Sequence, residues 1–360
     1  MLKAYAIENL RSGMKVGRDV VEADGNTLLT AGTILNNDII FNLLDRPIFS
    51  IYIEEPDVEA DIPGKEFLLD NNYVTTYNEV YESVGDIFTN LRESGQLDID
   101  NLHQLIRSKR MRELSNGAKA VSQIHNMTRS GGYLIHHCIH VAILAGLMAH
   151  WMRLPVDKGE NLVAAGLLHD VGKLKISEAI LDKPGKLTDE EFAEVKKHPA
   201  YGYEMLKNTA LSMNRDILLG VLQHHERCDG SGYPNHAVKD QISDFGRILA
   251  ILDVYDAMAA DRVFAKRRSP FDVFDVLHDD VLSGKLDPEY GVKFIRYVGH
   301  ALNGNWVMLS DGRRGRIVYI DESRVNALPV VQTTTGEFVD LNRSSDVKID
   351  YVLTASEASE

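Results

Sequence analysis

The chain has few cysteines, no long apolar run and no recognisable export signal. Cys138 and Cys228 are the two cysteines among 360 residues, so a disulfide framework is excluded and a reducing compartment is expected. No stretch approaches about 18 consecutive apolar residues, so we expect no membrane insertion. The first residues lack an apolar core followed by a small-residue cleavage site, and we therefore expect a cytoplasmic protein.

Positive charge is also scarce. The chain has 39 Lys and Arg against 53 Asp and Glu, a formal net charge of −14. Such a chain has no broad electrostatic attraction for polyanions, so DNA and RNA polymers are not expected as partners. A small anionic substrate stays compatible with this charge if the positive field is local.

The length of the chain and its changes of pattern predict a multidomain protein. Residues 1–60 are typical of a small β-rich N-terminal domain, with a hairpin at Asp24-Gly25 and a short helical segment after it. Residues 61–126 are expected to form an acidic linker and a helical connector, with apolar residues at spacings of three and four.

The centre of the chain, residues 127–303, is predicted to be an all-α helical bundle. Two capping boxes are expected at helix starts, Asp157 with Glu160 and Thr188 with Glu191.

Residues 304–360 return to strand character. Alternating segments surround Asp311-Gly312 and Gly336, which is enough sequence for a small four-stranded, barrel-like β module. The expected fold is thus a central helical bundle flanked by two small β-rich parts.

Histidine is the unusual residue, with 13 copies unevenly placed. Five histidines and two aspartates lie in or beside apolar helical runs of the central region: His137, His169, Asp170, His198, His224, His225 and Asp253. Such side chains are costly to bury unpaired, so a shared purpose is expected. Mixed imidazole and carboxylate ligands suit Fe, Mn or Zn better than Ca or Mg.

The motifs around these residues resemble, in order, those of the HD-GYP family, a branch of the HD-domain metal-dependent phosphohydrolases. They are His137, His169-Asp170-Val171-Gly172-Lys173, His198-Pro199, His224-His225-Glu226-Arg227, Asp229-Gly230-Ser231-Gly232-Tyr233-Pro234 and Asp253-Val254-Tyr255-Asp256-Ala257. The resemblance covers roughly residues 127–300, about half the chain. It implies an HD-type bundle that hydrolyses the bacterial messenger cyclic di-GMP to linear pGpG, and it leaves open whether hydrolysis continues to GMP.

The resemblance also implies a set of metal ligands. One ion would be held by His137, His169, Asp170 and Asp253, and the other by Asp170, His198, His224 and His225, with Asp170 as the bridge. Members with three metals carry a Glu one turn before the first histidine, where this chain has Tyr133, so we expect a binuclear site with Fe or Mn. Two cations about 3.5–4 Å apart can bridge an attacking hydroxide and screen the phosphate oxygens.

Two basic residues are expected to bind substrate. The resemblance places Lys173 and Arg262 on the phosphates, and Lys173 is counted as catalytic together with Asp170. Ala265 stands where a second basic residue usually follows, which predicts weaker phosphate binding unless Lys266 substitutes. Asp256 is expected to orient a ligand imidazole.

Two histidines near the first ligand are interpreted differently. His136 and His140 form an i, i+4 pair, which by itself is compatible with zinc. We interpret them as surface or packing residues.

Two classes of function stay open. The first is an active cyclic di-GMP phosphodiesterase, favoured by the complete ligand set. The second is a catalytically weak cyclic di-GMP-binding or scaffold protein, for which Ala265 is the one indication. A general HD nucleotidase is disfavoured by the tandem histidines and the Gly232-Tyr233-Pro234 loop. Protein partners are expected at this loop and at the N-terminal domain, and the oligomeric state, including a dimer, is left open.

Overall fold

The computed structural model describes the chain except for residues 1, 7–9, 11, 22–26, 45–49, 55–70, 116, 127–131, 260–268, 322, 345 and 354–360. The residues cluster into two compact units. Unit 1 contains Met1–Leu68, Gly117–Ser122 and Val298–Glu360, and unit 2 contains Leu69–Asn116 and Gln123–Tyr297. The acidic linker beyond Glu54 and the predicted phosphate-binding Arg262 lie outside the described residues.

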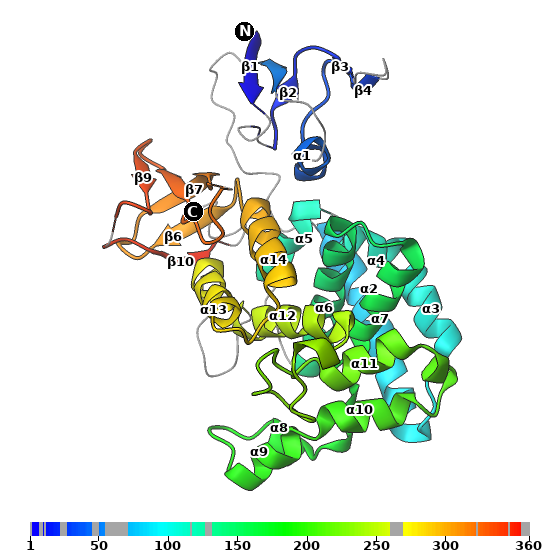
Figure 1. The fold of residues 1–360 in the computed structure, drawn as a ribbon. Helices are drawn as coiled ribbons and strands as arrows, with labels where there is room; N and C mark the ends of the chain where they lie inside the picture. The colour runs from blue at the N-terminus through cyan, green and yellow to red at the C-terminus, as the bar shows by residue number, and fades with distance from the viewer. Residues whose placement is uncertain are drawn as a thin grey trace. The chain divides into compact units, whose positions relative to one another are not determined.

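Unit 2 is built from helices (Figure 1), which confirms the predicted helical centre. Its α-helices are α2 (Asn71–Ser94), α3 (Ile99–Arg107), α4 (Lys109–Leu114), α6 (Tyr133–Trp151), α7 (Val156–Leu168), α8 (Glu178–Leu181), α9 (Asp189–Val195), α10 (His198–Leu206), α11 (Arg215–Gln223), α12 (Asp244–Ala259) and α13 (Pro270–Leu282). Three 3₁₀ turns join them: η3 (Val171–Lys175), η4 (Ala210–Met213) and η5 (Lys239–Gln241). Helices α5 (Gly117–Asn126) and α14 (Pro288–Ala301) run across the division between the units.

Helix α6 is the core helix of unit 2. Thirteen of its 19 residues are buried. At its crossing with α7, a Cβ on Gly166 would stand 3.1 Å from the Val141 carbonyl, so glycine lets the two backbones approach. By length and composition, α6 is the one helix of the described chain that could cross a membrane. However, 72% of its most apolar 18-residue stretch is buried inside the protein, as is usual for a core helix, so length and composition alone are weak evidence for a membrane span.

One of the two predicted capping boxes is present. Thr188 accepts from the Glu191 backbone N–H, and Glu191 in turn accepts from the Thr188 N–H, so α9 starts as predicted. The prediction of a second capping box at Asp157 and Glu160 is wrong. Helix α7 already begins at Val156, which places Asp157 inside the first turn, and Glu160 forms an ion pair of 2.8 Å with Arg107.

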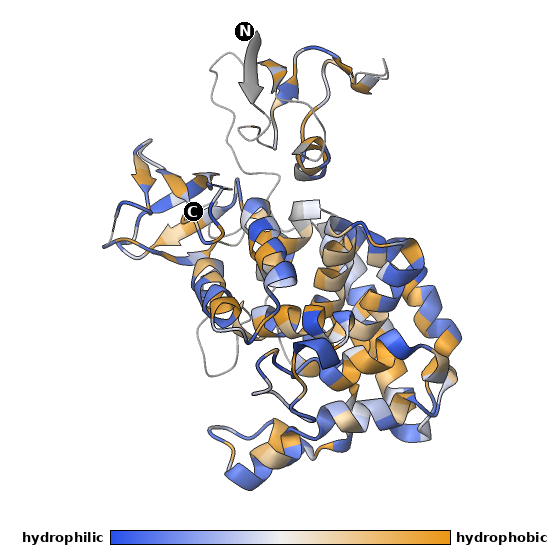
Figure 2. Cartoon of the chain, in the orientation of Figure 1, coloured by the Kyte–Doolittle hydropathy of each residue, from blue (hydrophilic) through white to orange (hydrophobic). Residues whose placement is uncertain are grey.

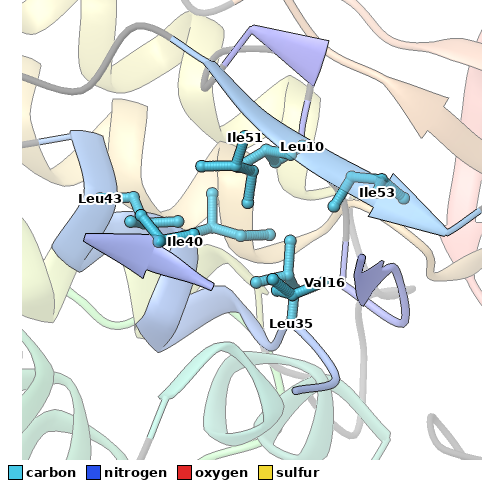
Figure 3. Packing of buried hydrophobic residues seen from close by; sticks show 8 residues of the cluster. Leu10, Val16, Leu35, Ile40, Leu43, Ile51 and Ile53 are labelled. Atoms are coloured by element: carbon cyan, nitrogen blue, oxygen red, sulfur yellow. The ribbon is translucent and has the colours of Figure 1, made fainter. Parts of the chain in front are cut away.

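The N-terminal part of unit 1 is rich in short strands, as predicted. Strands β1 (Leu2–Ala6), β5 (Ser50–Glu54) and β2 (Lys15–Val16) form an antiparallel sheet in the order β1-β5-β2, and β3 (Val20–Val21) pairs with β4 (Thr27–Leu29). Asp24-Gly25, the predicted turn between β3 and β4, lies outside the described residues. Helix α1 (Asn37–Leu44) contributes Ile40 and Leu43 to an apolar core that also contains Val16, Ile51 and Ile53 (Figure 3).

The C-terminal part of unit 1 is a single antiparallel sheet. Its strands are β6 (Trp306–Leu309), β7 (Arg314–Tyr319), β8 (Val330–Thr333), β9 (Phe338–Asp340) and β10 (Ile349–Val352), in the order β10-β6-β7-β8-β9. Buried and partly buried residues alternate along β6 and β8, and the strands carry both polar and apolar residues (Figure 2). Gly312 and Gly336 adopt φ of 85° and 84° in the predicted turns. The expected number of four strands is wrong, because β10 pairs with β6 as a fifth.

Candidate metal centre

Five segments of unit 2 bring the seven predicted ligand residues together. They are α6 with His137, the end of α7 with His169 and Asp170, the start of α10 with His198, the end of α11 with His224 and His225, and α12 with Asp253. Six of the seven are buried, and the side chain of His225 is 17% exposed.

The ligand atoms form two groups. The first contains His137, His169 and Asp253, and the second contains Asp170, His198, His224 and His225. Within each group the candidate ligand atoms all lie within 4.8 Å of one another. This division differs from the expected one only at Asp170, which the resemblance assigns to both ions.

Asp170 faces both groups with different oxygens. Its Oδ2 lies 3.5 Å from Nε2 of His137 and 3.5 Å from Nε2 of His169. Its Oδ1 lies 3.0 Å from Nε2 of His198 and 3.8 Å from Nε2 of His224. A carboxylate with one oxygen toward each group has the orientation that a bridging ligand needs.

Hydrogen bonds fix the tautomer of three of these imidazoles. Nδ1 donates to a backbone carbonyl three residues earlier in each case: His169 to Gly166 (2.8 Å), His198 to Val195 (2.7 Å) and His224 to Val221 (2.7 Å). A carbonyl can only accept, so Nδ1 carries the proton and Nε2 of the neutral ring carries a lone pair.

Two of these lone pairs point at one another. Nε2 of His198 lies 3.1 Å from Nε2 of His224. Two unprotonated nitrogens cannot hydrogen-bond to each other, and their lone pairs repel. A cation between them would convert the repulsion into ligation, so these donors fit divalent metal ions.

Asp170 Oδ1 supports the same conclusion. It is buried, and no hydrogen-bond donor reaches it within the described part of the chain. The nearby His198 Nε2 carries no proton in the tautomer above, so this contact is not a hydrogen bond. A buried carboxylate oxygen without a donor is costly unless a cation neutralises it.

Three of these histidines are held in the neutral state that metal binding requires. Burial lowers the pKa of His169 and of His224, and it lowers the pKa of His225 to about 3. These rings are therefore neutral near pH 7. Burial alone would raise the pKa of Asp170, but nearby Lys173 and His169 outweigh it and hold the pKa well below the usual range.

A buried carboxylate orients the first imidazole. Asp256 accepts hydrogen bonds from Nδ1 of His137 (2.7 Å) and from Nδ1 of His140 (3.0 Å). The predicted orienting role of Asp256 thus has the geometry it requires. His140 is fully buried, so it is a packing residue rather than a surface one, and no local pattern indicated its bond to Asp256. His136 instead contacts the Tyr77 hydroxyl at 2.8 Å.

Gly172 allows the second group to assemble. A Cβ at this position would lie 1.9 Å from the His198 carbonyl oxygen and 2.5 Å from the Gly202 nitrogen. Only glycine permits η3, which follows Asp170, to lie against the first turn of α10, which carries His198. The glycine of the His-Asp-Val-Gly-Lys motif, Gly172, is therefore required by packing, which the sequence alone did not indicate.

Glu226 and Gly232 hold the Gly-Tyr-Pro loop against the tandem histidines. Buried Glu226 accepts from the backbone N–H groups of Asn235 (2.7 Å) and Ala237 (2.9 Å). A Cβ on Gly232 would lie 2.4–2.5 Å from backbone atoms of residues 225–227. The Tyr233 ring consequently lies over the His225 ring, with centroids 4.6 Å apart.

The predicted phosphate-binding residues have different outcomes. Lys173 lies at the edge of the centre, its side chain 20% exposed, and its ammonium donates a hydrogen bond to Asp170 Oδ2. Arg262, Ala265 and Lys266 lie outside the described residues.

The sequence pattern of the HD domain family matches residues 102–290, slightly more than half of the chain. The chain belongs to the HD domain family. This HD-domain protein is also similar to a solved HDG"Y"P protein from Bdellovibrio bacteriovorus, with a TM-score of 0.51, 17% sequence identity and coverage of 82% of this chain and 98% of that one. At that identity, the similarity shows the fold alone.

Curated relatives of this HD-domain protein act on cyclic dinucleotides. It is 35% identical over 199 residues to a cyclic di-GMP phosphodiesterase of Pseudomonas aeruginosa, covering 55% of this chain and 47% of the relative. It is 43% identical over 124 residues to the cyclic di-GMP phosphodiesterase response regulator RpfG of Xanthomonas campestris, covering 34% and 32%. A 3'3'-cGAMP-specific phosphodiesterase of Vibrio cholerae is 41% identical over 128 residues, covering 36% and 24%. The matches thus span between a quarter and a half of these relatives' lengths.

Proposed function

We propose that this HD-domain protein is a metal-dependent phosphodiesterase that hydrolyses cyclic di-GMP to linear pGpG, and further to GMP. The observation that carries the proposal is the contact of 3.1 Å between the unprotonated Nε2 atoms of His198 and His224, which repel each other unless a cation lies between them. The names of the curated relatives support the substrate class.

The assignment of ligands follows the two groups. His137, His169 and Asp253 would hold one ion, His198, His224 and His225 the other, and Asp170 both. Bound divalent ions would supply Lewis-acid polarisation of the phosphate and acidify a water molecule at neutral pH. We propose two ions, Fe or Mn, with Tyr133 at the position where members with three metals carry a Glu.

The protein's own cations would bind the substrate's phosphate. The Lys173 ammonium forms an ion pair with Asp170. Because water screens charges only weakly at this largely buried position, the ammonium would also attract a nearby phosphate oxygen. We propose that Lys173 contacts a phosphate oxygen when Asp170 binds metal, because Asp170 Oδ2, which accepts from Lys173, is then shared with the metal. Arg262 would provide a second, bidentate contact.

Replacement of Asp170 tests this function directly. Anaerobically purified wild-type protein should contain two metals per chain and convert cyclic di-GMP to pGpG. Asp170→Ala removes the ligand shared by both groups, so metal content and turnover should fall together. Asp272→Ala, an exposed change on α13, is the matched control and should alter neither.

Two results would contradict the proposal. Metal-replete wild-type protein without hydrolysis of cyclic di-GMP would favour the alternative role as a binding or scaffold protein. Retention of both metals and near-normal turnover by Asp170→Ala would show that the ligand assignment is wrong.

A further inference from the structure

A cavity of about 550 Å³ lies within unit 2 beside the candidate metal centre. It is bounded by α2, the first turn of α6, η3, α8 and the segment that follows α8. Phe88, Leu134, Leu174 and Ile180 contribute apolar walls. Pockets of roughly 300–1,000 Å³ with apolar walls and a few polar groups are typical of small-molecule sites.

Two residues connect this cavity to the metal centre. Lys173 lines the cavity and donates to Asp170 Oδ2. Tyr133 also lines it, and its ring stacks on that of His137, with centroids 5.7 Å apart and planes 6° from parallel. A ligand that fills the cavity and contacts Lys173 therefore reaches the edge of the proposed phosphate site.

An ion pair also lines the cavity. Arg92 of α2 donates through both Nη1 and Nη2 to Glu178 Oε1 of α8, at 2.8 Å and 3.1 Å, and both residues line the cavity. Both side chains are more than half exposed, so the ion pair itself adds little stability and can rearrange around a ligand.

We propose that this cavity binds one guanosine half of the cyclic dinucleotide while its phosphate lies at Lys173. The proposal rests on the proposed function and adds a specificity-determining residue to it. The apolar walls suit a purine face, and the Glu178 carboxylate, which only accepts hydrogen bonds, suits the N1–H and N2–H₂ donors of guanine. Adenine presents an acceptor at N1 and has no N2 amine, so Glu178 would select guanine.

Equilibrium binding tests the cavity independently of catalysis. Cyclic di-GMP is titrated calorimetrically into EDTA-treated full-length protein, which cannot turn it over. Thr89→Trp should fill the cavity from α2 and raise Kd at least about tenfold. Asn90→Trp, at the next exposed position of α2 but not on the cavity wall, should leave Kd unchanged.

Base selection is tested with a second pair of variants. The ratio of Kd values for cyclic di-AMP and cyclic di-GMP should fall about five- to tenfold in Glu178→Gln, because its amide cannot accept from both guanine donors. Glu93→Gln, an exposed change on α2, should leave the ratio at its wild-type value.

The outcomes separate this inference from the proposed function. Equal Kd values for wild type and Thr89→Trp, or no binding by metal-free wild type, would overturn the cavity assignment, while hydrolysis by the metal-loaded protein would still support the function. An unchanged base ratio in Glu178→Gln would overturn the selective role of Glu178. If metal-loaded wild type hydrolyses no cyclic di-GMP but the metal-free protein binds it as expected, the catalytic proposal fails and the cavity assignment stands.

Discussion

Asp256 Oδ2 accepts a hydrogen bond of 2.7 Å from Nδ1 of His137. The bond holds the ring so that its Nε2 lies 3.1 Å from Asp253 Oδ1 and 3.2 Å from Nε2 of His169. Because Asp256 and His137 are separated by 119 residues, this relationship depends on how α6 and α12 pack.

Replacement of this carboxylate should weaken metal binding without removing a ligand. In Asp256→Asn, the amide can turn its NH₂ toward one of the two imidazoles and lose the orienting bond. We expect metal affinity to fall about 10- to 100-fold, with activity recovered in excess metal. Metal titration followed by elemental analysis measures this, with Asp272→Asn as control. Wild-type affinity in Asp256→Asn would show that His137 needs no such support.

Gly172→Ala should affect the second ligand group more than the first. The added Cβ meets backbone atoms of residues 198–202, which cannot move away by changing rotamer, so His198 must shift. We expect a loss of about 1–3 kcal/mol in the free energy of unfolding and about one metal per chain instead of two. Denaturant titration and elemental analysis provide the two readings.

Gly85→Ala is the matched control for that change. Its added Cβ would meet only Ile135 Cδ1, at an ordinary 3.8 Å, and alanine favours a helix by up to about 1 kcal/mol over glycine. A Gly172→Ala protein with two metals and control-like stability would contradict the packing argument.

Glu226→Gln should loosen the Gly-Tyr-Pro loop. One of the two carboxylate oxygens that accept from Asn235 and Ala237 becomes an NH₂ that faces a backbone donor. We expect stability to fall by about 1.5–3 kcal/mol and amide exchange to accelerate at residues 235–237. Exchange mass spectrometry detects this change, with the exposed Glu204→Gln as control. Equal protection in both variants would mean that Gly232 packing alone holds the loop.

Acid should destabilise the metal-free protein through its neutral histidines. His225 has a folded-state pKa of about 3 and an unfolded value near 6.5, so the unfolded chain binds one more proton between these limits. Its contribution to stability is complete above pH 6.5 and is lost at about 1.4 kcal/mol per pH unit as the pH falls toward 3. Urea unfolding of EDTA-treated protein at several pH values measures the slope. His225→Phe should reduce it by about that amount, and an unchanged slope would mean that His225 is protonated in the folded state.

The sequence alone determined the features that depend on local chemistry. Helix and strand periodicity identified the helical centre and the small strand-rich parts, because side-chain spacing reports which face of an element is buried. The order of the His and Asp motifs identified the seven candidate ligands, since few residue types can bind metals and their motifs are short. Even so, local signals failed at Asp157, where the helix started two residues earlier than its pattern indicated.

How these residues meet depends on contacts between elements that are distant in the chain. The separate orientation of the two Asp170 oxygens, the facing Nε2 atoms and the bond from His140 to Asp256 join positions far apart in the chain, and no local pattern encodes such contacts. The cavity wall from α2 lies 45 to 52 residues before the first ligand, His137, and carries no motif. The physical reason is that burial and packing, rather than spacing along the chain, determine which polar atoms share a low-dielectric site.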